Sequence, residues 1–157
     1  MQGNDFKLIT DGIKKVIDAE EGFLSALPVD VITLRRNSQN RSIKQILGHR
    51  VDSASNNHQR MVRLQYCKDL LFFPDYRQDN DLWIALQDYQ NADWENLIQL
   101  WKFFNLHIIQ VINSVDLSKL DSYWCDFEGT KVTLKEMIDG YLDHLHLHIR
   151  EIKELAL

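Results

Sequence analysis

Residues 134–155 read LKEMIDGYLDHLHLHIREIKEL, and the spacing within this stretch decides the fold. Apolar residues recur at intervals of three and four from Leu134 to Leu155, which is the period of an amphipathic helix. Thr133 and Glu136 are spaced as a capping box, which predicts the start of that helix. The stretch lacks proline and any cluster of β-branched residues, so we predict a helix rather than a strand.

Three further segments have the same helical period. They run from Phe6 to Leu24, from Ser42 to Leu64 and from Trp94 to Val115. Most turn-forming residues fall in the connections near residues 27–41, 74–90 and 116–132. In the last connection, Glu128 and Gly129 lie between β-tolerant residues, which predicts a short hairpin or extended loop before the final helix. Four amphipathic helices predict an all-α fold, a four-helix bundle, with residues 1–157 as one domain.

The composition is that of an ordinary globular protein of 157 residues, with 45% hydrophobic and 26% charged residues. The net charge of −5 argues against a nucleic-acid-binding surface, which is usually basic. Cys67 and Cys125 form neither a CxxC motif nor a disulfide framework, which favours a reducing compartment. The N-terminal stretch lacks the apolar core of a signal peptide, and no apolar run is long enough to span a bilayer. We therefore expect a cytoplasmic protein with neither nucleic-acid nor membrane partners.

Three histidines alternate with leucines in the last predicted helix. At about 100° per residue, His144 and His148 fall one turn apart on the side of the apolar face, whereas His146 points to solvent. Two inward imidazoles one turn apart can bind the same metal ion. They can equally be buried histidines that each hydrogen bond to a protein acceptor. Both interpretations are open at this point.

The second predicted helix carries a polar stripe beside its apolar face. The stripe consists of His49, Asp52, Ser53, Asn56 and Arg60. These side chains could line an internal cavity or face solvent. If the second and fourth helices are neighbours, His49 can meet the two histidines of the last helix. Three neutral imidazoles with positions left for water would then form a metal site of the catalytic type.

Two other features have alternative explanations. Glu20 falls on the apolar face of the first helix, where a carboxylate needs a partner or a raised pKa. It could support a metal site, act as a general base, or lie at the edge of the bundle. An aromatic cluster in the third helix, which is typical of core or dimer surface, consists of Trp94, Trp101, Phe103 and Phe104.

Two segments, IKQILGHRVDSASNNHQRMVRLQ at 43–65 and GYLDHLHLHIREI at 140–152, resemble the DinB/YfiT-like family of metal-dependent hydrolases. The resemblance extends over nearly the whole chain in length and helix layout. Its specific marks are an apolar-x-His-x-x-Asp-Ser pattern ending at Ser53, the following Asn56 and Arg60, and the late HxxxH. The family often has Trp before the second helix, where this chain has Arg41.

The resemblance implies a four-helix bundle that binds a divalent ion, zinc or nickel, through His49, His144 and His148. It implies an enzyme with a small-molecule substrate, either a hydrolase or a thiol S-transferase that uses a low-molecular-weight thiol such as bacillithiol. It also implies a homodimer. Asp52 would orient a ligand imidazole or hold water, and Arg60 would bind an anionic substrate group or form a structural ion pair. The alternative is a non-catalytic metal-binding or interaction module on the same bundle.

Overall fold

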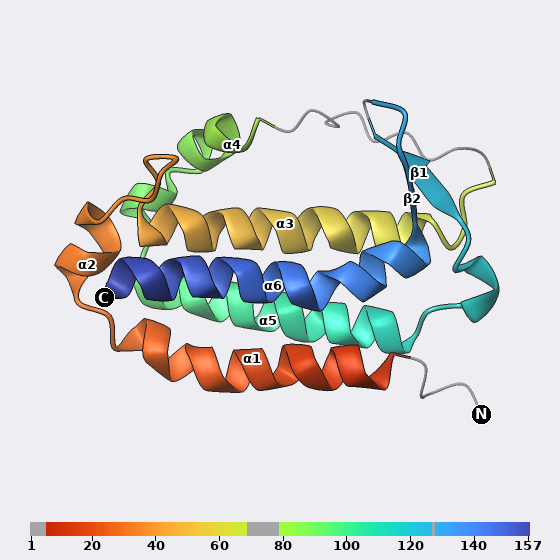
Figure 1. Cartoon of the computed structure of the whole chain (residues 1–157), viewed down its shortest axis with the longest axis horizontal. Coiled ribbons are helices and arrows are strands. Elements are labelled where there is room, and N and C mark those ends of the chain that lie inside the picture. The colour runs from red at the N-terminus through yellow and green to blue at the C-terminus, as the bar shows by residue number, and fades with distance from the viewer. Residues whose placement is uncertain (1–5, 69–78, 127) are drawn as a thin grey trace.

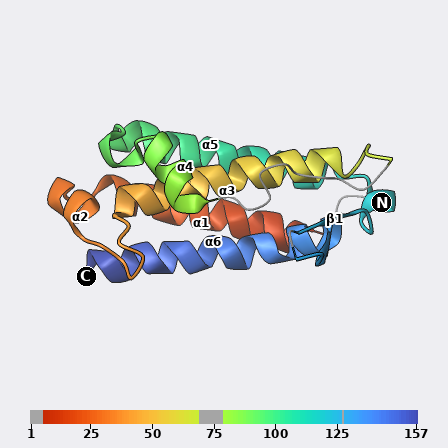
Figure 2. The same ribbon diagram turned by 90° about the horizontal axis from the view of Figure 1, so that it is seen from above.

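The computed structural model describes residues 6–68, 79–126 and 128–157. Its main body consists of four long helices that lie lengthwise against one another (Figure 1 and Figure 2). They are α1 (Lys7–Ser25), α3 (Ile43–Arg63), α5 (Trp94–Asn113) and α6 (Leu134–Ala156). The predicted all-α four-helix bundle is thus confirmed, and each long helix coincides closely with one of the periodic segments. Within the described residues, no helix is long and apolar enough to cross a membrane.

The order of the helices around the bundle decides which side chains can meet. α1 and α3 each pack against both α5 and α6, so α3 and α6 are neighbours. α3 and α6 run in opposite directions, whereas α3 and α5 run in the same direction (Figure 1). The beginning of α3 therefore lies beside the end of α6. This arrangement fulfils the condition under which a side chain from the second predicted helix can meet the histidines of the last.

Local sequence signals set the starts of two long helices. At the start of α3, the Ser42 hydroxyl accepts a hydrogen bond from the Gln45 backbone N–H, and the Gln45 side chain accepts one from the Ser42 N–H. The predicted capping box of α6 is also present, because Thr133 and Glu136 exchange the same two bonds. Each box satisfies two backbone donors that a helix start otherwise leaves open.

The predicted hairpin is present before α6. Strand β1 (Tyr123–Cys125) pairs with the antiparallel strand β2 (Lys131–Thr133). In the connecting turn, the Asp126 carboxylate accepts hydrogen bonds from the backbone N–H groups of Glu128 and Thr130. Gly129 has a φ of +83°, a left-handed conformation that glycine adopts without steric cost.

The other connections contain short helices that the sequence pattern did not predict. They are α2 (Val29–Leu34), α4 (Asn80–Leu86), and the 3₁₀ turns η1 (Tyr89–Asn91) and η2 (Leu117–Lys119). α2 and α4 bury one residue each, Ile32 and Ile84, so neither produces a periodic apolar signal. Arg41, where the family often has Trp, forms an ion pair with Asp81 that joins α4 to the start of α3. Part of the connection predicted at 74–90 lies outside the described residues.

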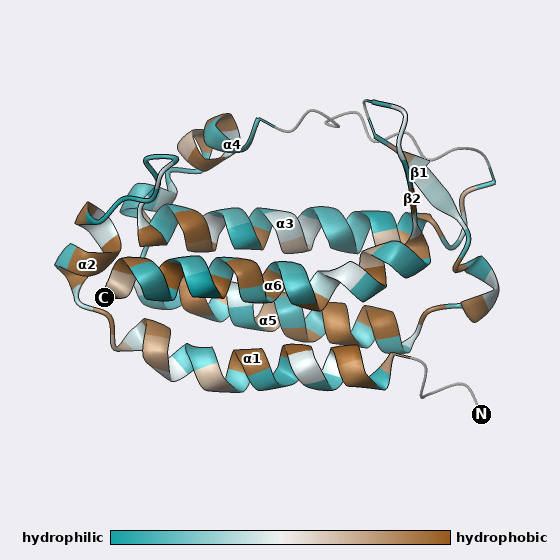
Figure 3. Ribbon diagram, in the orientation of Figure 1, coloured by the Kyte–Doolittle hydropathy of each residue, from teal (hydrophilic) through white to brown (hydrophobic). Residues whose placement is uncertain are grey.

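The core lies between the inner faces of the four long helices, each of which has apolar and polar stripes (Figure 3). Trp101 of α5 is fully buried, whereas Phe103 is 60% exposed, so the aromatic cluster divides between the core and the surface. Charged side chains are also buried among the apolar ones. Two of them, Arg50 and Asp52, lie on α3 shortly after His49.

Candidate functional site

Three histidine rings meet where the first half of α3 faces the second half of α6. The ring centroids of His49 and His148 are 5.6 Å apart, and those of His144 and His148 are 4.9 Å apart. His146 is exposed, as predicted, and borders a separate hollow together with Lys153. The cluster thus joins residues almost a hundred positions apart in the sequence, because α3 and α6 are antiparallel neighbours.

The two α6 histidines point their Nε2 atoms at each other. His144 Nε2 and His148 Nε2 are 3.3 Å apart. Two nitrogens that both bind a tetrahedral ion, each at 2.0–2.1 Å, are separated by about 3.3–3.4 Å. The same distance also allows a hydrogen bond between the two nitrogens when one of them carries a proton. The spacing of this pair is therefore close to that of two ligands of one ion.

The environment keeps the three imidazoles neutral. Burial, with smaller contributions from His148 and Arg50, lowers the pKa of His49 to about 3. His144 is exposed rather than on the buried side that its helical position predicted, but partial burial of the ring and then the Arg50 charge lower its pKa to about 4. Burial also lowers the pKa of His148, and Glu151 opposes this effect. A neutral imidazole is the form that binds a metal ion.

His148 has the outer contact that is usual for a metal-binding histidine. Its Nδ1 lies 2.9 Å from Glu151 Oε2, and the other oxygen of Glu151 accepts a hydrogen bond from Asn37. A carboxylate can only accept, so Nδ1 of His148 carries the proton and Nε2 has the free lone pair. Glu151 was not predicted from the sequence, although its position three residues after His148 places it within reach on the helix.

His144 has the opposite kind of outer contact. Its Nδ1 lies 3.0 Å from Nη1 of Arg50, a residue that is only 2% exposed. Burial lowers the pKa of the Arg50 guanidinium to about 10, so the group stays charged at neutral pH. Arg50 was not predicted from the sequence. The available signal was its position: seven residues after Ile43 and four before Ala54, it falls on the buried stripe of α3.

The three residues fit a divalent ion because they are imidazoles, meet from two helices and are neutral. The contact of His144 with Arg50 does not fit such an ion. His49 contributes a buried Nδ1 that has no hydrogen-bond partner among the described residues. In the described part of the chain, no group of three or more His, Cys, Asp or Glu side chains is arranged to hold a metal ion. His144 Nδ1 contacts the Arg50 cation, whereas the outer nitrogen of a metal-binding imidazole usually donates to an acceptor.

Asp52 contacts the connection that follows α4. Its Oδ1 accepts hydrogen bonds from the Tyr89 hydroxyl at 2.7 Å and from Gln87 Nε2 at 2.8 Å. Burial raises the pKa of Asp52, and the two hydrogen bonds oppose this rise. Its contacts within the described residues include no histidine ring. Asp52 thus fixes Tyr89 against α3, one turn after His49.

A hollow of about 220 Å³ opens beside His144 between α6 and the hairpin. Trp124 and Tyr141 supply apolar surface, and Asn57 a polar edge. The Arg60 guanidinium lies over the Trp124 ring, 4.3 Å from its centroid, in a cation–π contact. The stripe predicted on α3 therefore divides: His49 joins the histidine cluster, Asp52 binds Tyr89, and Arg60 reaches the hairpin.

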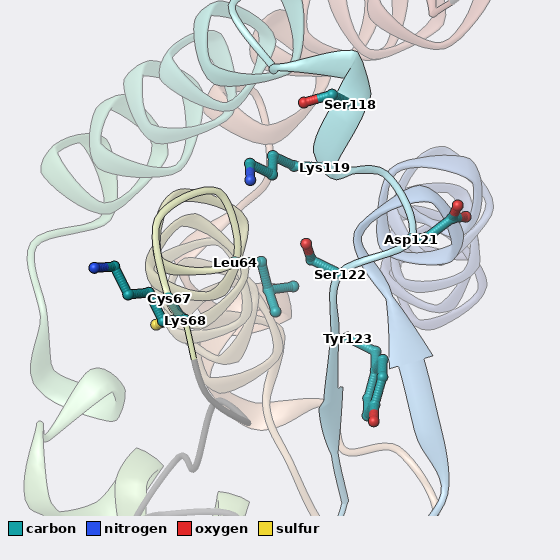
Figure 4. A pocket seen from close by; sticks show the side chains of 8 residues that line it. All are labelled: Leu64, Cys67, Lys68, Ser118, Lys119, Asp121, Ser122 and Tyr123. Atoms are coloured by element: carbon teal, nitrogen blue, oxygen red, sulfur yellow. The ribbon is translucent and has the colours of Figure 1, made fainter.

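A larger hollow of about 360 Å³ lies at the end of the bundle where α3 ends (Figure 4). Leu64, Cys67 and Lys68 form one side, and the other side consists of Ser118, Lys119, Asp121, Ser122 and Tyr123. Cys67 is a free thiol, as is Cys125. No histidine lines this hollow, so it is separate from the cluster.

Glu20 has a structural partner. Its Oε1 accepts a hydrogen bond from Lys153 Nζ at 2.7 Å, which joins α1 to α6. Glu20 is 7% exposed, and its second oxygen has no hydrogen-bond partner among the described residues. Of the three roles considered from the sequence, this contact favours the position at the bundle edge, where buried Glu20 pairs with the half-exposed Lys153.

Comparison with known proteins places these features in a family. The model of the DinB superfamily matches residues 13–152. Among solved structures, the chain is similar to YfiT from Bacillus subtilis, described as a probable metal-dependent hydrolase with an unusual four-helix bundle topology. The TM-score is 0.84 at 16% sequence identity, and the match covers 99% of this chain and 87% of YfiT. No curated protein matches the chain.

Proposed function

The chain belongs to the DinB superfamily, and we propose that it is a metal-dependent enzyme whose divalent ion binds to His49, His144 and His148. The observation that carries the proposal is the meeting of these three neutral imidazoles from two helices. The description of YfiT as a probable metal-dependent hydrolase agrees with it.

Zinc and nickel are the ions we propose, because imidazole ligands suit both. Three protein ligands leave positions for water and substrate, as in catalytic sites. The chemistry that such an ion supplies is a nucleophile near neutral pH, from water in hydrolysis or from a thiol in S-transfer. We place hydrolysis first and transfer with a low-molecular-weight thiol second.

The surrounding residues have defined tasks in this proposal. Glu151 holds the proton of His148 on Nδ1 and so keeps the Nε2 lone pair directed at the ion. A small-molecule substrate would occupy the hollow beside His144, with its apolar part on Trp124. Arg60, whose guanidinium lies over the Trp124 ring, would bind an anionic group of that substrate. Asp52 would support His49 indirectly, by fixing α3 against Tyr89.

The hollow also favours an enzyme over a non-catalytic module on the same bundle. A purely structural ion is usually enclosed by four protein ligands. Here the Glu151 carboxylate contacts the outer nitrogen of His148 and the Asp52 carboxylate contacts Tyr89, so we propose neither as a fourth ligand. His144 instead borders open space large enough for a small ligand.

We further propose a homodimer in the cytoplasm. Leu100 and Phe103 are 48% and 60% exposed and lie one turn apart on α5, where a second copy could cover them. Light scattering should give the mass of a dimer for the wild type and of a monomer for Phe103→Glu. The two free cysteines, Cys67 and Cys125, agree with a reducing compartment.

The proposed function is tested by metal analysis of untagged protein after exposure to Zn²⁺ or Ni²⁺ and gel filtration. The wild type should retain about one ion per chain, whereas His49→Ala and His148→Ala should lose it. His146→Ala is the matched control, since it removes an exposed histidine from the same helix. If the wild type retains no more metal than His49→Ala and His148→Ala, the proposal is wrong.

Product analysis then separates the two chemistries. The metal-loaded wild type is incubated with a set of small esters and amides, and in parallel with alkylating electrophiles and a low-molecular-weight thiol. Hydrolysis products that require His49 would support a hydrolase, and thioether products that require His49 would support a thiol transferase.

A further inference from the structure

The hydrogen bond between Arg50 and His144 has only one possible direction. A guanidinium has N–H donors and no acceptor, so Arg50 Nη1 donates and His144 Nδ1 accepts over their 3.0 Å separation. A neutral imidazole has one protonated and one unprotonated nitrogen. The proton of His144 is therefore on Nε2.

The next contacts continue in the same direction. His144 Nε2 faces His148 Nε2 at 3.3 Å, and His148 Nδ1 faces the Glu151 carboxylate at 2.9 Å. Because the carboxylate only accepts, His148 carries its proton on Nδ1 and presents a lone pair at Nε2. The Nε2–H of His144 thus points at that lone pair. A buried cation, two neutral imidazoles and a carboxylate form one directed chain from Arg50 to Glu151.

This chain of hydrogen bonds conflicts with metal binding at one atom, Nε2 of His144. In the proposed function, the ion needs the Nε2 lone pairs of both α6 histidines, and His148 already presents its own. His144 presents a proton instead, because Arg50 occupies the lone pair of its Nδ1. The positive charge of Arg50, buried beside the cluster, also opposes the arrival of a divalent cation.

We propose that Arg50 is a built-in competitor of the metal ion: it holds His144 as the Nε2–H tautomer and must release Nδ1 before the ion can bind. The inference rests on the proposed function. When the contact breaks, the proton of the neutral ring transfers from Nε2 to Nδ1 by exchange with water. The number of protons on the ring is unchanged. The ion can then bind to the unprotonated Nε2. The new Nδ1–H donates a hydrogen bond to water or to a protein acceptor.

The tautomers can be read directly in the metal-free wild type. Nitrogen NMR of the imidazole rings distinguishes a protonated from an unprotonated nitrogen at each position. In chelator-treated protein, His144 should be protonated at Nε2 and His148 at Nδ1. Finding His144 protonated at Nδ1 would overturn the inference without requiring any variant to fold.

Zinc titration calorimetry tests the competition. Arg50→Met removes both the donor and the charge, and Arg50→Gln offers an amide oxygen that can accept from Nδ1 of His144. Both variants should bind Zn²⁺ about 10- to 100-fold more tightly than the wild type, the range typical of changes to the outer partner of a ligand imidazole. Arg150→Met is the matched control, because it removes the same charge from an exposed position on α6 and should leave the affinity unchanged.

The possible results separate the two proposals. If the wild type and Arg50→Met bind Zn²⁺ equally and both require His49, the inference about Arg50 is overturned and the proposed function stands. If neither binds Zn²⁺, the proposed function is overturned and the inference with it. Equal tightening in Arg50→Met and Arg150→Met would reduce the effect to net charge and overturn the specific role of Arg50.

Discussion

Replacement of Gly48 by alanine should destabilise the protein, against the usual benefit of alanine in a helix. Gly48 lies inside α3, and the ring of Tyr89 packs directly on it. A methyl group at Gly48 would lie 2.6 Å from Cδ1 of Tyr89 and even closer to two other ring carbons. The ring cannot bend away as a flexible side chain could, so it has to leave its position.

The expected loss follows from what that ring does. Displacing an aromatic side chain that is 6% exposed forfeits about 1.5–3 kcal/mol of apolar burial. The Asp52 carboxylate, 3% exposed, also loses the Tyr89 hydroxyl, and an unsatisfied buried group costs about 1–3 kcal/mol. Alanine returns about 1 kcal/mol of helix propensity. The free energy of unfolding should therefore fall by about 1.5–5 kcal/mol.

Urea denaturation followed by circular dichroism measures the change in the free energy of unfolding. Alanine substitutions at two other glycines serve as controls. A methyl group at Gly22 meets nothing within 4 Å, so Gly22→Ala should be neutral or stabilising. At Gly12 it would overlap only the end of the Leu142 side chain, which can move, so Gly12→Ala should fall between the other two. In a Tyr89→Ala background, the penalty of Gly48→Ala should disappear.

The reasoning is refuted if Gly48→Ala is as stable as Gly22→Ala. It also fails if the Gly48→Ala penalty is the same with and without Tyr89. In either case the contact between η1 and α3 would not be the source of the effect, and the support proposed for His49 through Asp52 would lose its basis.

The remaining expectations concern pH and the ion pair of buried Glu20 with half-exposed Lys153. In metal-free protein, the pKa values of His49 and His144 lie below the unfolded value of 6.5. The unfolded chain then binds more protons, so the free energy of unfolding should fall as the pH is lowered from about 6.5 to about 4. Thermal melts should show a shallower dependence for His49→Gln, and an equal slope would contradict these pKa shifts. Lys153→Ala should cost about 1–3 kcal/mol because it leaves Glu20 buried without its partner, whereas Lys135→Ala, from an exposed pair, should change stability by less than about 0.5 kcal/mol. Equal losses in urea denaturation would refute that difference.

The long helices could be predicted because their signals are local and repeated. The α6 start combines a capping box at Thr133 with an apolar period that continues for the length of the helix. The hairpin was predictable for the same reason, since Gly129 marks its turn. α2 and α4 were missed because a helix of one or two turns that buries a single side chain has no period to detect.

The pairing of helices was not available from the sequence. The period of α3 shows that His49 flanks an apolar face, but not whether α5 or α6 covers it. Only the order around the bundle brings His49 to His148. The same limit applies to Asp52, whose partner Tyr89 belongs to a short turn that no pattern indicates. Its expected contact with a ligand imidazole depended on that unknown neighbour.

Arg50 shows how a departure from a pattern can carry information. The buried stripe of α3 includes Ile43, Leu47, Ala54 and Met61, and Arg50 occupies the place in that row where another apolar residue would fit. A charge at such a position is costly unless it is paired. His144 is its hydrogen-bond partner, and the nearby Glu151 carboxylate adds a favourable charge. Because this buried cation contacts the histidine cluster directly, Arg50 is the position in the cluster that we would test first.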